Sequence, residues 1–560
     1  MSDATSKSQA NRELLVDAQS KGLGATLGAY TKLSGPGWLQ SAITLGGGSL
    51  SGALFLGVLG GVNFLWLQLL AIICGVIMLS AISYVTLSTG ERPFKAINRH
   101  INPVLGWGWI IATVLANIIW CMPQFGLSFE ALQKNLMPGS LTDTNNSKFT
   151  VSAILLVAAS FVVVMNRRQG AAAKFFDYFL KALVGMVVLC FFGVVIYLGL
   201  QGHLDWGKIF AGFVPDISQW SAPTGRLAEI LPTLDESSRE FWTAKIIGSQ
   251  QSVMIGAAAT AVGINMTFLL PYSMLNRGWD KPFRGLARFD LCTGMAIPYM
   301  LVTSCVVIAA SSAFHGKADD NFLSDNPETI IKSSVFGGAK GLLAERLELS
   351  KDDSDLKIAT AATELDDSEM QLAAALVKRN AFQLSESLAP LLGAKNAKLI
   401  FGIGVFGMGF STIIILMLIN GYAFCELFDQ PQDSPMYVVG CLVSGIAGAL
   451  WPLVWAGGSR FWLTILASVF GMMLLPIAYF TFFLMMNSKS LMGDEKPKGV
   501  SMVLWNALMI FALLGAIVGA ASAIWTKAGD PKAGVVVMAM AGLYLVAVAF
   551  GFAMKKKVAT

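Results

Sequence analysis

The chain has 560 residues, of which 55% are hydrophobic and only 13% are charged, with a formal net charge of +5 and a mean hydropathy of +0.62. Soluble domains carry about 25% charged residues, so this composition excludes a soluble enzyme or a soluble binding module. We expect an integral membrane protein whose surface meets the lipid bilayer and which has no nucleic-acid partner.

Apolar runs separated by polar loops fill most of the sequence after a polar N-terminal segment. Each run has roughly the 18 to 25 residues that a helix needs to cross the hydrocarbon of a bilayer, and the alternation typical of membrane strands is missing from the sequence. The sequence therefore predicts an all-α membrane protein with about twelve spans. The predicted spans are 36–58, 63–88, 104–130, 150–166, 178–201, 247–274, 290–313, 398–427, 437–457, 461–486, 500–526 and 533–554.

Loop charge predicts how these spans are oriented. Several loops on one side are rich in Lys and Arg, as in "NRGWDKPFRGLAR" (276–288), whereas the short connections on the other side carry few. The positive-inside rule then places both termini in the cytoplasm, and we expect a plasma (inner) membrane location. The predicted parts are a cytoplasmic segment 1–34, helices 1–7 within 35–314, an extracytoplasmic module 315–397, helices 8–12 within 398–554, and a cytoplasmic tail 555–560.

The predicted outer module is acidic. Between 316 and 397 there are fourteen acidic and nine basic residues, grouped in stretches such as "KDDSDLK" and "ELDDSEM". The module is interpreted first as a solvated cap with one or two amphipathic helices, although an acidic surface could also concentrate cations.

The first span contains "LGGGS" at 45–49, which is unusual for a membrane helix. Glycines lower the cost of unwinding, and the backbone groups that become free can bind an ion or a polar solute. A break of this kind survives in lipid only where it lines a cavity inside the protein. The alternative interpretation is close helix packing through small residues.

The sixth span has a similar interruption in "GAAATAVGINMTFLLPYSML" (256–275), where Gly263 lies beside Asn265 and Thr267. Two interrupted spans five apart are typical of transporters built from an inverted repeat with a substrate site at the membrane midplane. We therefore expect two inverted sets of five spans, with broken helices 1 and 6 and two further spans outside.

Other signatures argue against catalysis and against a bound cofactor. The chain has no Gly-x-x-x-x-Gly-Lys phosphate loop, no Gly-x-Ser-x-Gly elbow and no His-Glu-x-x-His pair. All seven cysteines lie in or beside apolar runs, so no disulfide framework is expected. The three histidines are far apart without ligand spacing, and they are interpreted as surface residues.

Five stretches carry a family resemblance: "GPGWLQSAITLGGGS" (35–49), "IAT" (111–113), "AT…N" with the following "NRGW…RGLARFD" (259–290), "SESLAPLLGAKNAKLIFGIGVFGMGFST" (385–412) and "WLTILASVFGMMLLPIAYFTFFLMMNSKSLMG" (462–493). They resemble the Nramp (natural resistance-associated macrophage protein) family of proton-coupled divalent-metal transporters. The resemblance implies the LeuT-type (APC-type) inverted 5+5 fold and a metal-cation substrate.

The motifs that hold the metal in that family differ here. Where the family has Asp-Pro-Gly-Asn in helix 1, this chain has "GGGS" at 46–49, and where it has Met-Pro-His in helix 6, this chain has "VGI" at 262–264. The paired acids of helix 3 align with Val114 and Asn117, and the glutamine of helix 10 aligns with Ser468. The usual carboxylate, thioether and proton-carrying groups are therefore missing from their expected positions.

We predict a secondary-active transporter, a symporter, of an inorganic, divalent metal cation with altered selectivity; protons are a candidate coupling ion, although the acids that carry them in the family are missing. Ser49 and Asn265 are weak candidates as metal ligands, and the ligand set is otherwise unassigned. Two alternatives stay open: a transporter of a small organic solute, and a membrane sensor that transports nothing. The predicted substrate-binding residues are Thr44, Gly46, Gly47, Gly48, Ser49, Ala259, Thr260, Val262, Gly263, Asn265 and Ser468.

Overall fold

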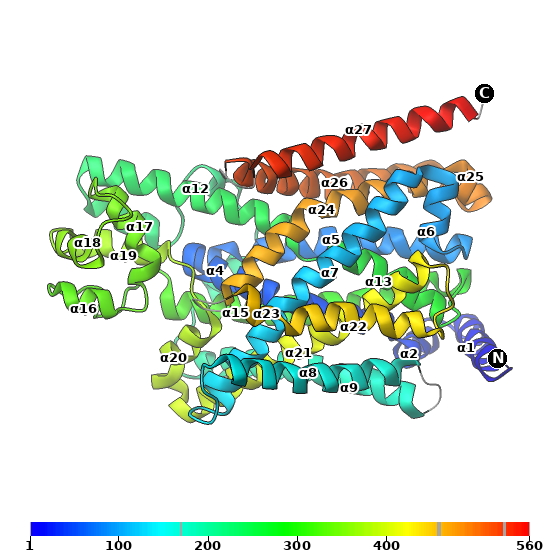
Figure 1. Ribbon diagram of the computed structural model, residues 1–560, viewed down its shortest axis with the longest axis horizontal. Helices are drawn as coiled ribbons and strands as arrows, with labels where there is room; N and C mark the ends of the chain where they lie inside the picture. The colour runs from blue at the N-terminus through cyan, green and yellow to red at the C-terminus, as the bar shows by residue number, and fades with distance from the viewer. Residues whose placement is uncertain (1, 168–170, 456–460, 530–533, 559–560) are drawn as a thin grey trace.

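A computed structural model describes residues 2–167, 171–455, 461–529 and 534–558. These residues form helices, turns and loops, with no strand among them. Most of the long helices run along the long axis of the molecule (Figure 1). Within the described ranges, nine helical segments are long and apolar enough to cross a membrane. The all-helical architecture expected from the sequence is confirmed.

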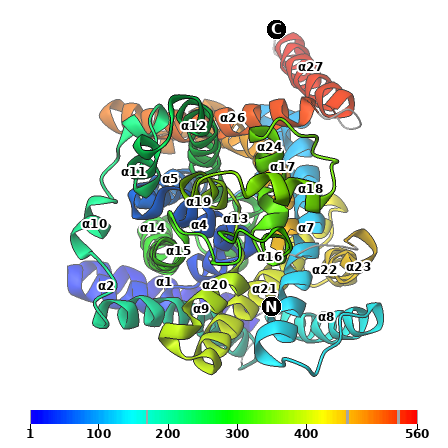
Figure 2. The same cartoon turned by 90° about the vertical axis from the view of Figure 1, so that its left-hand side faces the viewer.

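Both chain ends lie at one end of the long axis, and the polar module lies at the other (Figure 1). We call these ends the terminal face and the module face. Two helices precede the first span at the terminal face, α1 (Ser2–Ser20) and α2 (Leu23–Leu33). Figure 2 looks onto the module face and shows that the last helix, α27 (Gly534–Val558), projects from the bundle.

Each predicted span coincides with a helix or with a pair of shorter helices. The helices before the module are α3 (Pro36–Thr44), α4 (Gly47–Gly60), α5 (Leu65–Thr89), α6 (Pro93–Ala96), α7 (Pro103–Ala131), α8 (Asn145–Arg167), α9 (Ala171–Leu200), α10 (Trp206–Ala211), α11 (Arg226–Ile230), α12 (Glu236–Thr260), α13 (Ile264–Asn276), α14 (Arg284–Leu291) and α15 (Ile297–Phe314). Those after it are α21 (Ala394–Leu427), α22 (Pro435–Ala449), α23 (Trp451–Val454), α24 (Phe461–Asn487), α25 (Lys489–Met492) and α26 (Gly499–Ala528), followed by α27.

The two predicted interruptions are present. The first span divides into α3 and α4 around Leu45 and Gly46, and the sixth divides into α12 and α13 around 261–263. A Cβ at Gly46 would lie 2.9 Å from Thr412 Oγ1 and 3.1 Å from the Ile43 carbonyl oxygen. Glycine is therefore needed at this break because α21 approaches the backbone closely.

Asp290 of α14 anchors the N-terminus of α3. Its carboxylate accepts hydrogen bonds from the Gly37 N–H at 2.6 Å, from the Gly35 N–H at 3.2 Å and from the Ser34 hydroxyl. These donors are unpaired helix-end groups, which a carboxylate satisfies well. α3 itself is almost wholly buried, so it fills the space between the helix breaks and the terminal face.

The module is a group of short helices and not an extended loop. It contains α16 (Pro327–Lys332), α17 (Phe336–Arg346), α18 (Asp355–Ala362), α19 (Asp367–Ala375) and α20 (Ala381–Leu392). The predicted amphipathic stretch corresponds to α19 and α20, and α20 packs on α21 and α15 of the bundle. The sequence boundaries of the module stay a prediction.

His315 lies where the module leaves the bundle, and only 6% of it is exposed. Its Nε2 accepts the Arg226 N–H at 3.0 Å, and its Nδ1 lies 3.0 Å from the Val58 carbonyl oxygen. Burial lowers the pKa of this imidazole, which fits a neutral ring that donates from Nδ1. The expectation that all three histidines lie on the surface is therefore wrong for His315.

Glu369 of α19 fastens the module to α12. Its carboxylate accepts from the Trp242 indole N–H at 2.6 Å and from the Ser238 hydroxyl at 3.2 Å, and it pairs with Arg346 at 2.6 Å. Glu369 is 4% exposed, so its charge depends on these partners instead of on water.

We expect Glu369→Ala to loosen the module without unfolding the bundle. Removing one member of a buried ion pair costs about 3 kcal/mol or more, because the Arg346 charge and two donors lose their acceptor. The measurement is hydrogen exchange of peptides from 336–375, where protection should fall. Glu364→Ala, an exposed position in the same module, is the matched control and should change little; equal protection in both variants would contradict the assignment.

Candidate functional site

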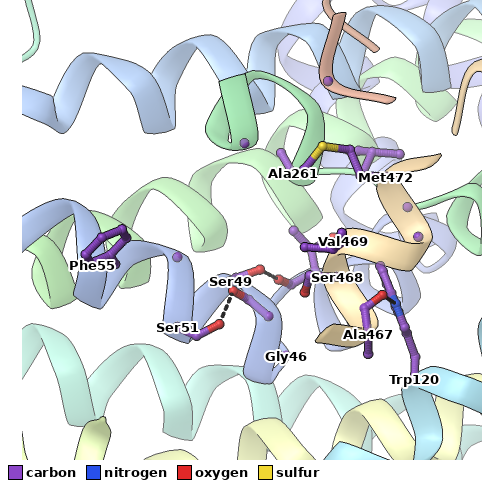
Figure 3. Close-up of a pocket in the computed structure, with 18 of the residues that line it drawn as sticks. Gly46, Ser49, Ser51, Phe55, Trp120, Ala261, Ala467, Ser468, Val469 and Met472 are labelled. Carbon is purple, nitrogen blue, oxygen red and sulfur yellow. Dashed lines mark hydrogen bonds between the residues drawn. The ribbon is translucent and has the colours of Figure 1, made fainter. Parts of the chain in front are cut away.

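A cavity of about 360 Å³ lies at the two helix breaks. Residues of α4, α13, α24 and α26 border it, and α7 contributes Trp120 and Gln124 (Figure 3). From the breaks the cavity extends along α4 toward Phe55, in the direction of the module face. The polar residues nearest the breaks are Thr44, Ser49, Ser51, Gln124, Thr412 and Ser468.

The cavity gathers most of the predicted site residues. Those that line it are Thr44, Gly46, Gly48, Ser49, Val262, Gly263 and Ser468. Gly47 and Asn265 are buried beside the cavity and are not among its lining residues. Ala259 and Thr260 end α12, and their side chains lie outside the described residues.

Side chains satisfy part of the backbone that the first break frees. The Gly47 N–H donates to Gln124 Oε1 at 3.2 Å, and the Ser49 hydroxyl donates to the Thr44 carbonyl. The Ser51 hydroxyl donates to the Gly48 carbonyl at 2.9 Å (Figure 3). The bonds at the Gly47 N–H and the Thr44 carbonyl replace helical bonds that an unwound segment cannot make within a bilayer, whereas the Ser51 bond is a local one inside α4.

α24 forms the opposite wall of the cavity. Ser49 and Ser468 face each other across the cavity in Figure 3. A Cβ at Gly48 would lie 2.7 Å from Ser468 Oγ, so the two walls approach closely at this point. The break therefore presents hydroxyl oxygens from two different spans to one small volume.

At the second break Asn265 forms a hydrogen bond within its own chain. Its Oδ1 accepts the Met266 N–H at 2.9 Å, and the side chain is fully buried. Asn265 Nδ2 has no hydrogen-bond partner within the described part of the chain. The amide thus satisfies an N–H at the start of α13, and it does not line the cavity.

Two methionine side chains line the cavity and were not identified from the sequence. Met266 lies four positions after 262, and its sulfur is 3.4 Å from Thr44 Oγ1. Met472 lies near Ala261 across the cavity (Figure 3). The helical period could not have revealed Met266 from position 262, because the break at 261–263 interrupts the helix between them. The cavity therefore keeps soft sulfur atoms although the aligned position holds Val262.

Lys378 is the only charged residue among the described residues that line the cavity. It belongs to the loop between α19 and α20, and its Nζ lies 5.0 Å from the centre of the Phe55 ring. Burial lowers the pKa of this lysine because its charge loses hydration. In the sequence, the only indication that Lys378 could reach a binding site is the pair of basic residues in "VKRN", which lies in an acidic module. This indication is weak.

The aligned positions of the third span hold no acid. The Asn117 side-chain amide donates to Asn420 Oδ1 at 2.8 Å, and both residues are fully buried. Neither lines the cavity, and Val114 is half-buried. A neutral amide pair therefore links α7 to α21 at this level.

At the breaks the cavity presents uncharged oxygen and sulfur atoms together with helix ends. α4 and α13 begin at the breaks with positive dipole ends, whereas α3 and α12 end there with carbonyl groups. Among the described residues, no group of three or more His, Cys, Asp or Glu side chains could hold a metal ion. A hydrated cation or a small polar solute fits this lining better than a bare transition metal.

Comparison with known proteins identifies the scaffold. The family model described as natural resistance-associated macrophage protein-like matches residues 37–326 and 358–550. The gap between the two matched stretches falls in the module, around α16 and α17. The search of curated proteins finds no match.

Solved structures share the same fold at low sequence identity. A histidine-to-alanine mutant of the manganese transporter of Eremococcus coleocola superposes with a TM-score of 0.62 at 12% identity, covering 94% of each chain. The manganese transporter of the same organism in complex with an aromatic bis-isothiourea substituted compound gives 0.59 at 15% identity, covering 94% of this chain and 93% of that one. The broken spans, the extent of the family match and this shared fold lead to one conclusion: the chain is a multi-pass membrane protein with the LeuT-type fold, and it belongs to the Nramp family.

Proposed function

We propose that this protein is a secondary-active transporter of a divalent metal cation that keeps part of its hydration shell. The supporting observation is the oxygen-lined cavity at the two helix breaks, in a chain that belongs to the Nramp family. Transporters with broken helices bind their substrates where the half-helices meet. The substrate in this proposal is the ion and its bound waters.

The lining favours a hydrated ion over a bare one. Stripping a divalent ion of water carries a desolvation cost that serine and threonine hydroxyls do not offset without a carboxylate. Magnesium keeps several waters when proteins bind it, and a cavity of about 360 Å³ has room for many water molecules. Ser49 and Ser468 would then contact the ion directly or through water.

The proposed transporter has a defined orientation in the membrane, and its third span lacks the acids that would couple transport to protons. The basic loops at the terminal face would lie in the cytoplasm, and the module would lie outside the plasma (inner) membrane. The Asn117–Asn420 pair cannot carry a proton in the way that paired acids would. Coupling to protons, if the transporter uses it, would need another group.

A small organic solute is the second candidate, and one observation favours it. The N-terminal ends of α4 and α13 attract a carboxylate at the breaks, and the Lys378 ammonium does so at the Phe55 end of the cavity. A zwitterion would place its carboxylate there and its cationic group beside the carbonyl ends of α3 and α12.

We expect Ser49→Trp to abolish uptake of magnesium and manganese into proteoliposomes, because the indole would fill the space between α4 and α24. Gly193→Trp is the matched control, since a Cβ at this exposed glycine of α9 meets no atom within 4 Å. Both variants should elute as folded protein. Saturable uptake in Ser49→Trp equal to the wild type would show that the substrate path lies elsewhere.

We also expect Gly48→Asp to tighten the binding of bare Mn²⁺ by about tenfold or more, because a carboxylate is the ligand that the cavity lacks. The added side chain would approach Ser468 Oγ, the mobile end of a small side chain. Gly48→Asn, of equal size and no charge, is the control. Isothermal titration calorimetry gives the comparison, and equal affinities for Asp and Asn would contradict a divalent-cation site at this break.

A further inference from the structure

The cavity has two chemically different ends. One end, at the helix breaks, presents the hydroxyls of Ser49 and Ser468. The other end, next to Phe55, presents the ammonium of Lys378. Phe55 lies six positions after Ser49 on α4, which is a rise of about 9 Å along an α-helix. A single small ion cannot contact both ends at once.

The cationic end has no counter-charge in the described structure. Lys378 is half-buried, and its described contact is the face of the Phe55 ring. The attraction between an aromatic face and an ammonium group offsets only part of the hydration free energy that the ammonium loses on burial. A negatively charged ligand beside Lys378 would offset the rest of that lost hydration free energy.

Arg379 adds a second positive charge behind the first. It is 4% exposed, its guanidinium lies 5.3 Å from the centre of the Phe314 ring, and its Nε has no hydrogen-bond partner in the part of the chain that the structure describes. Burial lowers the pKa of the Arg379 guanidinium to about 10. The Asp319 carboxylate opposes this lowering in part, through an electrostatic attraction at longer range. Its carboxylate accepts from the Ser333 hydroxyl at 2.8 Å. The loop between α19 and α20 therefore holds two adjacent cationic side chains, one half-buried and one buried.

These charges conflict with a cation that enters the cavity alone. A divalent ion at the breaks would share one enclosed volume with the Lys378 ammonium, and the described lining contains no acidic side chain to separate or neutralise them. Like charges in a low-dielectric cavity repel strongly. A substrate that carries its own negative charge would relieve this repulsion.

We propose that the transported species is a complex of a divalent metal cation with a small carboxylate ligand, and that Lys378 binds a carboxylate of that ligand while the oxygens at the helix breaks face the metal. This inference rests on the proposed function, and it names the substrate class. No covalent bond forms or breaks: carboxylate oxygens replace some waters on the metal, and those waters return to the solvent.

A metal–carboxylate complex as substrate explains why a chain with the Nramp scaffold can lack the metal-binding motif of that family. The ligand supplies the carboxylates that the "GGGS" segment lacks, and the glycines leave the room that the larger substrate needs. An elongated complex also spans the two ends of the cavity, which matches its extension along α4 toward Phe55.

The test measures binding to the purified full chain by isothermal titration calorimetry, with three probes: Mn²⁺ alone, citrate alone, and an equimolar mixture of the two. We expect the mixture to bind about tenfold or more tightly than either component, and Lys378→Gln to lower that affinity by about tenfold or more. Lys378→Arg should retain it. Lys332→Gln, at an exposed lysine of the same module, should leave it unchanged.

Each outcome decides a different point. If Mn²⁺ alone binds as tightly as the mixture and Lys378→Gln has no effect, the inference is overturned and the proposed function stands. If citrate binds equally with and without Mn²⁺, the metal is not part of the substrate and both are overturned in favour of an organic solute. If the folded wild-type chain binds none of the three probes, the complex is rejected. The comparison of probes on the wild type needs no variant, so a misfolded Lys378→Gln protein does not prevent a decision.

Discussion

A spanning helix that breaks inside a bilayer leaves backbone N–H and C=O groups without water, and each must find a partner within the protein. This constraint organises the structure around α3, α4, α12 and α13. Gln124 and Ser49 satisfy groups at the first break, and the Asn265 side chain satisfies one at the second. The cavity forms where the breaks face each other, so the candidate site and the interruption of the helices have the same physical origin.

The sequence predicted the features that depend on local chemistry. The lengths of the apolar runs predicted the membrane spans. The glycines at 46–48 and 263 predicted both interruptions, because no other residue lowers the cost of unwinding a helix as much. The predicted role of Asn265 in lining the site depended on a detail that composition does not contain: its amide bonds the next N–H of its own chain. Lys378 was missed because it is more than 300 positions from Ser49 in the sequence, and only the docking of the module brings it to the cavity.

Family membership and substrate chemistry are separable in this chain. The broken spans are kept, yet the described cavity lining contains one lysine and no acid, and a neutral amide pair joins α7 to α21 where the family's paired acids align. A scaffold can keep its fold while the charge of its site changes, since the fold depends on packing and on satisfied backbone groups. Selectivity must therefore be argued from the charges that face the cavity, and these favour a substrate that brings negative charge with it.

The two halves of the first span are held in different ways. α3 is fixed at its start by the Asp290 carboxylate and is buried along its length, and only Leu45 and Gly46 separate it from α4. A movement of α3 away from α14 would break the bonds from Ser34 and Gly37 to Asp290. On the module side the cavity is lined instead by Lys378, whose ammonium lies against the Phe55 ring. The two sides of the cavity therefore differ in chemistry, because one has a helix end bound to a carboxylate and the other has a lysine.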